Sequence, residues 1–223
     1  PDPKQIKAAA EKLKNSKQPI IISGGGVLYS EAEAELSAFA KKHNIPVTAT
    51  VMGIGCMQHD DPYYISAIGC LGEGSSNSIS KDTDLALAIG TKLSDFTTGS
   101  WTNFQNPDFS LVSINTARFD TTKHRASPVV SDAKIGLNKL SKELGDWRAP
   151  SNWYERAIEE KQKWEAYVQK ESGPTNQETP SYAQAVGAVY RNADPSDIVV
   201  TAAGGLVGEV VQIWKPKQLN TFE

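Results

Sequence analysis

The chain has 223 residues, of which 39% are hydrophobic and 22% are charged, enough for one large domain or one and a half. Its formal net charge of −3 argues against a nucleic-acid or anionic-membrane partner, because either would require a basic face. No apolar run approaches the roughly 20 residues that a membrane-spanning helix needs.

Cysteine usage and the N-terminal residues bear on where the protein works. Cys56 and Cys70 have no CxxC spacing, so we predict two buried thiols in a reducing cytoplasm. No signal peptide is visible. The start at Pro1-Asp2-Pro3 resembles an artificial boundary, however, so this absence says little.

Helical and short apolar patterns alternate along the first 148 residues. Residues at i, i+3, i+4 and i+7 spacing predict one apolar stripe on a first helix: Ile6, Ala9, Ala10 and Leu13. Residues 19–22 predict a strand. Ser30 and Glu33 form the pattern of a capping box that opens a second helix. The buried face of that helix is predicted to be Ala32, Leu36, Phe39 and Ala40.

Further short apolar runs predict strands at 46–50, 85–90, 110–114 and 128–130. Asp132 is predicted to cap a following helix that Gly145 ends. This alternation of strands and helices indicates right-handed βαβ units. The predicted fold class is therefore α/β, with a doubly wound, mostly parallel, Rossmann-like sheet.

The pattern changes after Trp147. Residues 151–171 predict a charge-rich helix too sparsely apolar to lie in a core, and residues 172–179 predict a linker. Thr179 and Pro180 then predict the N-cap and first position of a helix, followed by a strand at 198–201. One helix, one strand and a second helix cannot close a sheet, so we expect a truncated second α/β unit. We expect its apolar residues to be disordered, docked on the first unit or paired with a second molecule.

Three glycine-containing turns are candidate binding sites. Ser23-Gly24-Gly25-Gly26 lies between a strand and a helix, where backbone N–H groups can approach a phosphate. The GxGxxG fingerprint fails, because Tyr29 stands where the third glycine should be. Residues 69–77 precede a predicted helix, and residues 201–206 follow a β-branched strand. For each turn, ligand contact and plain structural packing remain open.

The histidines predict no metal site. His43, His59 and His124 are scattered without ligand spacing. We interpret His59 as part of a solvated turn, in preference to a general acid or base. For His124 a solvated loop is preferred to a phosphate contact.

Several runs together resemble the central domain of thiamine-diphosphate-dependent enzymes such as acetolactate synthase. They are residues 19–27, 53–55, 69–72 and 85–96. More selective runs resemble the branch of that family that hydrolyses a cyclic 1,2-diketone in myo-inositol breakdown: residues 95–101, 115–120 with 123–126, and 202–206. The resemblance covers essentially the whole chain.

This resemblance implies a parent enzyme with three α/β domains per subunit, active sites shared between two subunits, and thiamine diphosphate with Mg²⁺ as cofactors. It places the central domain at 1–148, a helical linker at 149–179 and the start of the diphosphate-binding domain at 180–223. It implies missing flanking domains and a homodimer or homotetramer in the parent.

The expected cofactor-binding residues lie on two turns: Gly204, Gly205 and Leu206, which match the segment that approaches the diphosphate, and Gly24, Gly25 and Gly26. Related enzymes have Gly-x-His at the first of these turns, so any contact here should be through the main chain. FAD or ADP in the central domain is conceivable, but we expect none.

The resemblance also has departures. Gly53-Ile54-Gly55 replaces a frequent Gly-Lys-Gly, which weakens a charged role at that turn. The family's catalytic glutamate belongs to a domain that the matched region does not include, and no Gly-Asp-Gly metal motif occurs. We therefore predict no catalytic and no metal-binding residue in this chain, and no activity for it alone.

Two alternatives differ from a cyclic-diketone hydrolase. One is an acetolactate-synthase-like carboligase, against which the run 95–101 argues. The other is a stand-alone nucleotide-binding Rossmann module, which would bind FAD, ADP or NAD without any further domain.

Overall fold

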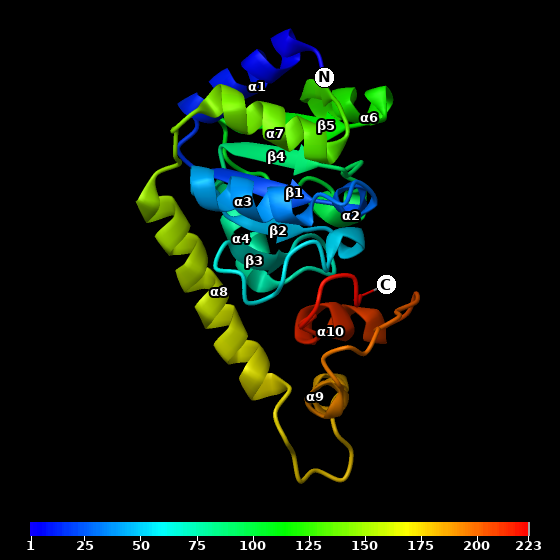
Figure 1. The fold of residues 1–223 in the computed structure, drawn as a ribbon. Helices are drawn as coiled ribbons and strands as arrows, with labels where there is room; N and C mark the ends of the chain where they lie inside the picture. Colours follow the sequence, from blue (N-terminus) through cyan, green and yellow to red (C-terminus); the bar gives the residue numbers. More distant parts are fainter. Residues whose placement is uncertain (223) are drawn as a thin grey trace.

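The computed structural model describes residues 1–222. Within them, six parallel strands form one sheet in the order β3-β2-β1-β4-β5-β6 (Figure 1). The strands are β1 (Pro19–Ser23), β2 (Val47–Ala49), β3 (Tyr64–Ala67), β4 (Leu85–Ile89), β5 (Ser110–Asn115) and β6 (Ser127–Val130). This is the strand order of the Rossmann-type doubly wound fold, so the predicted fold class is confirmed.

Helices cover both faces of the sheet. The α-helices of the described residues, including α9 and α10 beyond the sheet, are α1 (Pro3–Asn15), α2 (Gly25–Tyr29), α3 (Glu33–His43), α4 (Gly74–Asp82), α5 (Asp95–Thr98), α6 (Arg118–Thr122), α7 (Ala133–Leu144), α8 (Ser151–Glu171), α9 (Tyr182–Asn192) and α10 (Leu206–Ile213). Two 3-10 turns are η1 (Val51–Gly53) and η2 (Lys123–Arg125). We call residues 1–148 the sheet unit and residues 180–222 the tail.

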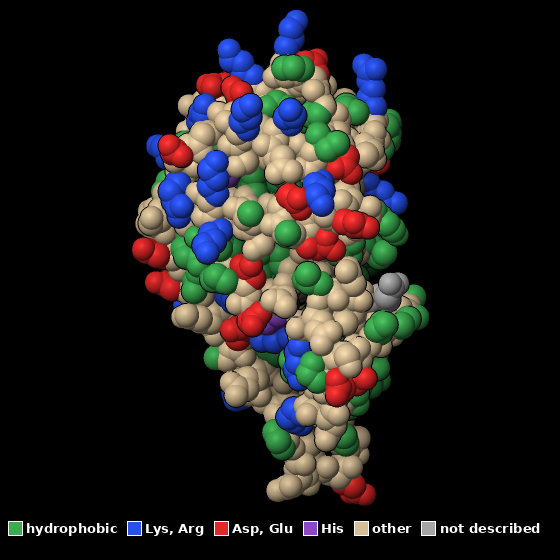
Figure 2. All heavy atoms as spheres, viewed as in Figure 1, with side chains coloured by type: hydrophobic (Ala, Val, Ile, Leu, Met, Phe, Trp, Pro, Cys, Tyr) green, Lys and Arg blue, Asp and Glu red, His purple; other side chains and the backbone are tan. Residues whose placement is uncertain are grey.

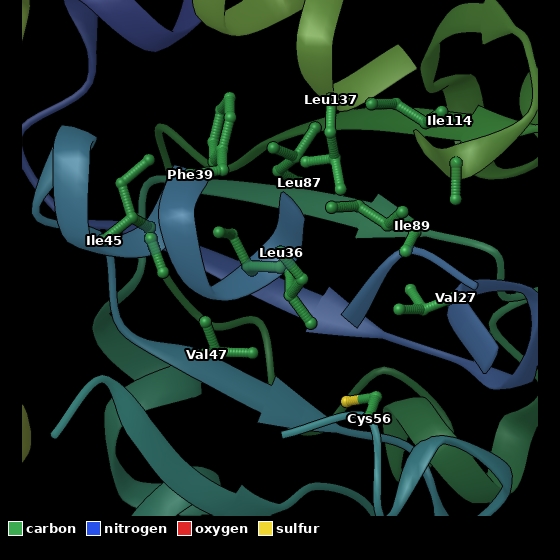
Figure 3. Packing of buried hydrophobic residues seen from close by; sticks show 14 of the residues in the cluster. Val27, Leu36, Phe39, Ile45, Val47, Cys56, Leu87, Ile89, Ile114 and Leu137 are labelled. Atoms are coloured by element: carbon green, nitrogen blue, oxygen red, sulfur yellow. The ribbon is translucent and has the colours of Figure 1, made fainter. Parts of the chain in front are cut away.

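Alternate residues of β1 enter two separate cores. Ile21 packs with residues of α1, α3 and α7, whereas Ile20 and Ile22 pack on the opposite face with residues of α4 and α8. Figure 3 shows the first core, whose side chains include Leu36 and Phe39 of α3 and Leu87 of β4. Strands that are apolar on both faces are typical of a parallel sheet covered by helices.

The predicted strands match β1, β2, β4, β5 and β6, but β3 was not predicted. It has only four residues, Tyr64–Ala67, and pairs with β2 alone, with a register shift between Val47 and Thr48. Its length does not explain the miss, since β2 is shorter and β6 is equally short; the buried polar Ser66 interrupts its apolar run.

The first helices follow the predicted pattern in their packing but not in their capping. The predicted stripe of α1 and the predicted face of α3 are both buried, which confirms them. The predicted capping box is wrong, because α3 begins after Ala32 without a side-chain cap. Ser30 instead accepts a hydrogen bond from the Ala133 N–H (3.4 Å), at the start of α7. Asp132 caps α7 as predicted, by accepting from the Ile135 N–H at 3.1 Å.

Helix α8 is a long helix, as predicted, but it is not peripheral. Trp153 is 3% exposed, and its indole Nε1 donates to the Pro19 carbonyl at 2.9 Å. A Cβ on Gly74 would lie 2.6 Å from the Trp164 ring, so α4 and α8 touch closely there. The prediction that α8 lies outside a core is therefore wrong. One large side chain, Trp153, and the small Gly74 opposite Trp164 are enough to pack this helix against the sheet unit.

The tail differs from its predicted elements. Ser181 caps α9 in a capping box with Gln184, in place of the predicted Thr179. The predicted strand at 198–201 is reduced to one parallel bridge between Val199 and Phe222, because no neighbouring strand pairs with it among the described residues. Val211 is 2% exposed and joins the core of the sheet unit. Of the three expected outcomes, docking on the sheet unit is the one observed (Figure 1).

Candidate functional site

The turn Gly24–Gly26 lies at the carboxyl end of β1, beside the end of β4, where the winding of the sheet reverses. In Rossmann-type folds ligands bind at this crevice. The Gly24 N–H donates to the Ile89 carbonyl and the Gly26 N–H donates to the Gly90 carbonyl, both at 2.9 Å. Two of the three glycine N–H groups are thus hydrogen-bonded to β4 and the turn after it. Fewer backbone N–H groups of this turn are therefore free to bind a phosphate.

Close backbone approach explains the glycines at this turn. A Cβ on Gly24 would lie 2.5 Å from the Gly90 oxygen, and a Cβ on Gly26 would lie 2.6 Å from the Gly90 Cα. Gly90 itself has φ +60. Gly53 fills a similar role, since its Cβ would lie 2.4 Å from the Ser23 oxygen. These four glycines therefore allow the backbones of the turns after β1, β2 and β4 to pack in direct contact.

The second candidate turn, residues 69–77, is also tied down by internal hydrogen bonds. The Asn77 side chain both accepts from the Gly69 N–H (3.0 Å) and donates to the Gly69 carbonyl (2.9 Å). The Cys70 N–H donates to Phe96, and the Glu73 N–H donates to Ala67. These contacts favour the structural interpretation of this turn.

The third candidate turn is open. Gly204 has φ +146, and a Cβ on Gly204 or Gly205 would meet nothing within 4 Å. Residues 202–206 are exposed and lead into α10. The N-cap of this helix is Gly205, so no side chain at that position caps its first N–H groups. An exposed backbone at a helix N-terminus fits a diphosphate contact through the main chain. The same residues supply no carboxylate for a metal.

A cluster of ionisable side chains, which was not predicted, lies between the sheet unit, α8 and the tail. Glu165 Oε1 lies 3.0 Å from His59 Nε2, 3.6 Å from Lys215 Nζ and 4.0 Å from Lys161 Nζ. Glu73 is 5% exposed, and the positive charge of Lys215 partly offsets the effect of burial on its pKa. We call these five residues the junction cluster. His59 and Glu165 are separated by 106 residues, and only the i,i+4 spacing of Lys161 and Glu165 was a local signal.

Burial and pairing set the protonation of the junction cluster. Burial raises the pKa of Glu73 to about 8. The hydrogen bond from His59 lowers the pKa of Glu165 to about 2, while burial lowers the pKa of His59. Both directions fit a neutral imidazole whose Nε2–H donates to a carboxylate. His59 therefore belongs to a partly buried network, which corrects its interpretation as a solvated turn.

The other titratable residues singled out from the sequence are structural. His43 is buried, with Nδ1 2.7 Å from the Trp147 oxygen, and it links α3 to the segment after α7. The exposed His124 packs edge-on against the Trp101 ring at 4.5 Å. Cys56 is buried as predicted, but Cys70 is exposed, which corrects the prediction of two buried thiols.

Residues 1–222 contain neither of the two features described next, a cluster that could hold a metal ion and a helix that could span a membrane. No group of three or more His, Cys, Asp or Glu side chains there is arranged to hold a metal ion. None of the helices in the described part of the chain combines the length and the apolar character needed to cross a lipid bilayer.

A family model describes the sheet unit. Residues 6–140 match the model of the thiamine pyrophosphate enzyme, central domain. The matched region contains the six strands of the sheet and the first eight residues of α7. The chain belongs to this family.

Similar proteins extend the match into the tail. The chain is 33% identical over 246 residues to a 3D-(3,5/4)-trihydroxycyclohexane-1,2-dione hydrolase of Clostridium tetani, covering 100% of this chain and 38% of that protein. Proteins with the same name are 34% identical in Clostridium botulinum strain Alaska E43 (94% of this chain, 36% of that protein) and 32% identical in Bacillus anthracis (96% and 37%). The chain thus spans little more than a third of these relatives.

Proposed function

We propose that the chain is the central domain (1–148), helical linker (149–179) and start of the diphosphate-binding domain (180–223) of a thiamine-diphosphate-dependent hydrolase. The reaction proposed for the whole protein is hydrolytic cleavage of a C–C bond in a cyclic 1,2-diketone, trihydroxycyclohexane-1,2-dione, in inositol breakdown. The observation that carries this proposal is the match of 94–100% of the chain to relatives of that name. Their likeness extends beyond the family model at 6–140 into the tail.

Each part of the chain has a proposed role. When bound, thiamine diphosphate supplies a thiazolium carbanion that attacks a carbonyl and serves as an electron sink. The exposed turn Gly204-Gly205-Leu206 would contact its diphosphate through backbone N–H groups. The sheet unit would act as a scaffold. We propose that it binds no FAD or ADP, and the engaged N–H groups of Gly24 and Gly26 support this.

The remaining machinery is proposed to lie outside this chain. Mg²⁺ would be held by residues of the rest of the diphosphate-binding domain, and the cofactor-activating glutamate by a further domain of the same polypeptide. A homodimer or homotetramer in the cytoplasm would complete the active sites. Chain 1–223 alone should then neither catalyse ring opening nor bind thiamine diphosphate.

The test is to express the whole reading frame and supply the cyclic dione with and without thiamine diphosphate and Mg²⁺. Ring opening that requires the cofactor, with no acetolactate formed from pyruvate, supports the proposal. Acetolactate formation without ring opening would replace it with a carboligase. Calorimetric titration of chain 1–223 with FAD, ADP and NAD adds a third arm, since micromolar binding would favour a nucleotide-binding module.

A further inference from the structure

The tail meets the sheet unit through α10 and the junction cluster. A Cβ on Gly208 would lie 3.7 Å from Leu71 Cδ2, and Val211 is buried in the core of the sheet unit. At the other end of α10, Lys215 lies 3.6 Å from Glu165. Figure 2 shows acidic, histidine and basic side chains gathered where the tail adjoins the rest of the molecule.

Apolar contacts alone would not fix α10 along its own axis, because hydrophobic burial is non-directional. The ion pair at Lys215 is directional and joins α10 to one point of α8. The exposed glycine turn at 202–205 directly precedes α10, so its position follows that of the helix.

Glu165 is itself held in place. His59 Nε2 lies 3.0 Å from its Oε1, on the side of the sheet unit. Lys161 donates to the backbone oxygens of His59 (2.9 Å) and Tyr64 (2.7 Å), which anchors that loop to α8. One carboxylate oxygen therefore connects the sheet unit, α8 and the tail.

We propose that Glu165 is a positioning residue: through Lys215 it fixes α10 and hence the glycine turn 202–205 relative to the sheet unit. That the turn serves a cofactor diphosphate rests on the function proposed above. The proposal that the Glu165 carboxylate fixes the tail is independent of that function, so the two parts can be tested separately.

Hydrogen–deuterium exchange of chain 1–223 tests the first part. Lys215→Gln and Glu165→Gln should each speed exchange of amides in 206–213 about tenfold, since the broken pair is only partly screened by solvent. Peptides of β1 and β4 should not change. Lys215→Arg keeps the charge and should restore slow exchange. Glu160→Gln, which removes an exposed pair with Lys163 on the same helix, is the matched control.

Three exchange results would overturn the proposal: unchanged exchange in Lys215→Gln, an equal increase in Lys215→Arg, or an equal increase in Glu160→Gln. A double variant Glu165→Gln/Lys215→Gln should exchange no faster than the faster single variant, because both remove one interaction. Fully additive effects would contradict a direct pair.

Steady-state kinetics of the whole protein tests the second part. Glu165→Gln should raise the KM for thiamine diphosphate about tenfold and leave kcat at saturating cofactor within about twofold, because a positioning residue affects binding geometry and not the reacting atoms. A lower kcat with unchanged KM would overturn the positioning role. If the whole protein needs no thiamine diphosphate, the proposed function fails, while the exchange experiment still decides whether Glu165 fixes the tail.

Discussion

Gly26 and Gly90 touch backbone to backbone across the point where the winding of the sheet reverses. The Gly26 N–H donates to the Gly90 carbonyl at 2.9 Å, and a Cβ on Gly26 would lie 2.6 Å from the Gly90 Cα. This contact joins the turn after β1 to the turn after β4. It lies at the crevice where many doubly wound proteins bind a ligand.

Gly26→Ala should lower the free energy of unfolding by roughly 1–3 kcal/mol, because the new methyl group must displace backbone atoms. Urea denaturation followed by circular dichroism measures the change. Gly205→Ala is the matched control, since its Cβ would meet nothing within 4 Å and its φ is −65, and it should change stability by less than about 0.5 kcal/mol. Equal stability of Gly26→Ala and the wild type would show that the turn can relax.

Glu73 should make stability depend on pH. Because its pKa in the folded protein is about 8, the native state keeps a proton that the unfolded chain releases near pH 4.5. The resulting stability is fully present below pH 4.5 and is lost as the pH rises through about 8. Glu73→Gln, which mimics the protonated form, should match the wild type at pH 5 and exceed its free energy of unfolding by roughly 1–4 kcal/mol at pH 9.

Urea midpoints at pH 5, 7 and 9 measure this difference. The same substitution at the exposed Glu178 is the control for a simple change in net charge. A difference between Glu73→Gln and the wild type that stays constant over this range would mean that Glu73 is ionised in the native state throughout.

Trp153→Phe should cost roughly 1–3 kcal/mol, because it leaves the buried Pro19 carbonyl without the indole donor and removes packing volume. Trp164→Phe is a close control on the same helix. Its indole Nε1 is buried without a hydrogen-bond partner among the described residues, so its removal deletes no hydrogen bond. Thermal or urea denaturation should rank Trp153→Phe as clearly less stable. The opposite order would show that the Pro19 bond contributes little.

The two thiols should differ sharply in reactivity. Cys56 is fully buried, its sulfur lies 2.9 Å from Ser23 Oγ, and burial raises its pKa to about 12. Only the thiolate reacts, so Cys56 should resist a thiol reagent at pH 8 until the protein unfolds. Cys70 is exposed and should react at once. Native protein should therefore titrate one thiol, and Cys70→Ser none. Rapid reaction of both would indicate local opening around Ser23.

Local patterns predicted those parts of the fold that depend on local chemistry. Residues 85–90 identified β4 because a strand covered on both faces is apolar throughout. Asp132 was recognised as a cap because the aspartate and the amide it bonds are three residues apart. Ser30 also had a local capping pattern, but its hydroxyl accepts a hydrogen bond from the Ala133 N–H at the start of α7. Ala133 is 103 residues away in the chain, so local sequence patterns could not reveal this contact.

Long-range relationships account for what could not be predicted. Residues 198–201 have high β-propensity, yet a strand forms only where another strand pairs with it. The junction cluster joins His59 to Glu165, which are far apart in sequence and meet only when α8 lies along the sheet. The glycine turns could be located from the sequence, but their roles could not be distinguished. Gly24 is closely packed against other backbone atoms, whereas Gly204 has open space around it, and the sequence shows only a glycine at each position.

The single bridge between Val199 and Phe222 has a practical consequence for handling the chain. Ile198 is 63% exposed and Val200 is 77% exposed, so two β-branched side chains flank a barely paired extended segment. A segment of this kind can template the addition of another strand, including the same segment of a neighbouring molecule. Solutions of this chain should therefore become turbid with increasing concentration, and a charged residue at position 198 or 200 should delay the onset.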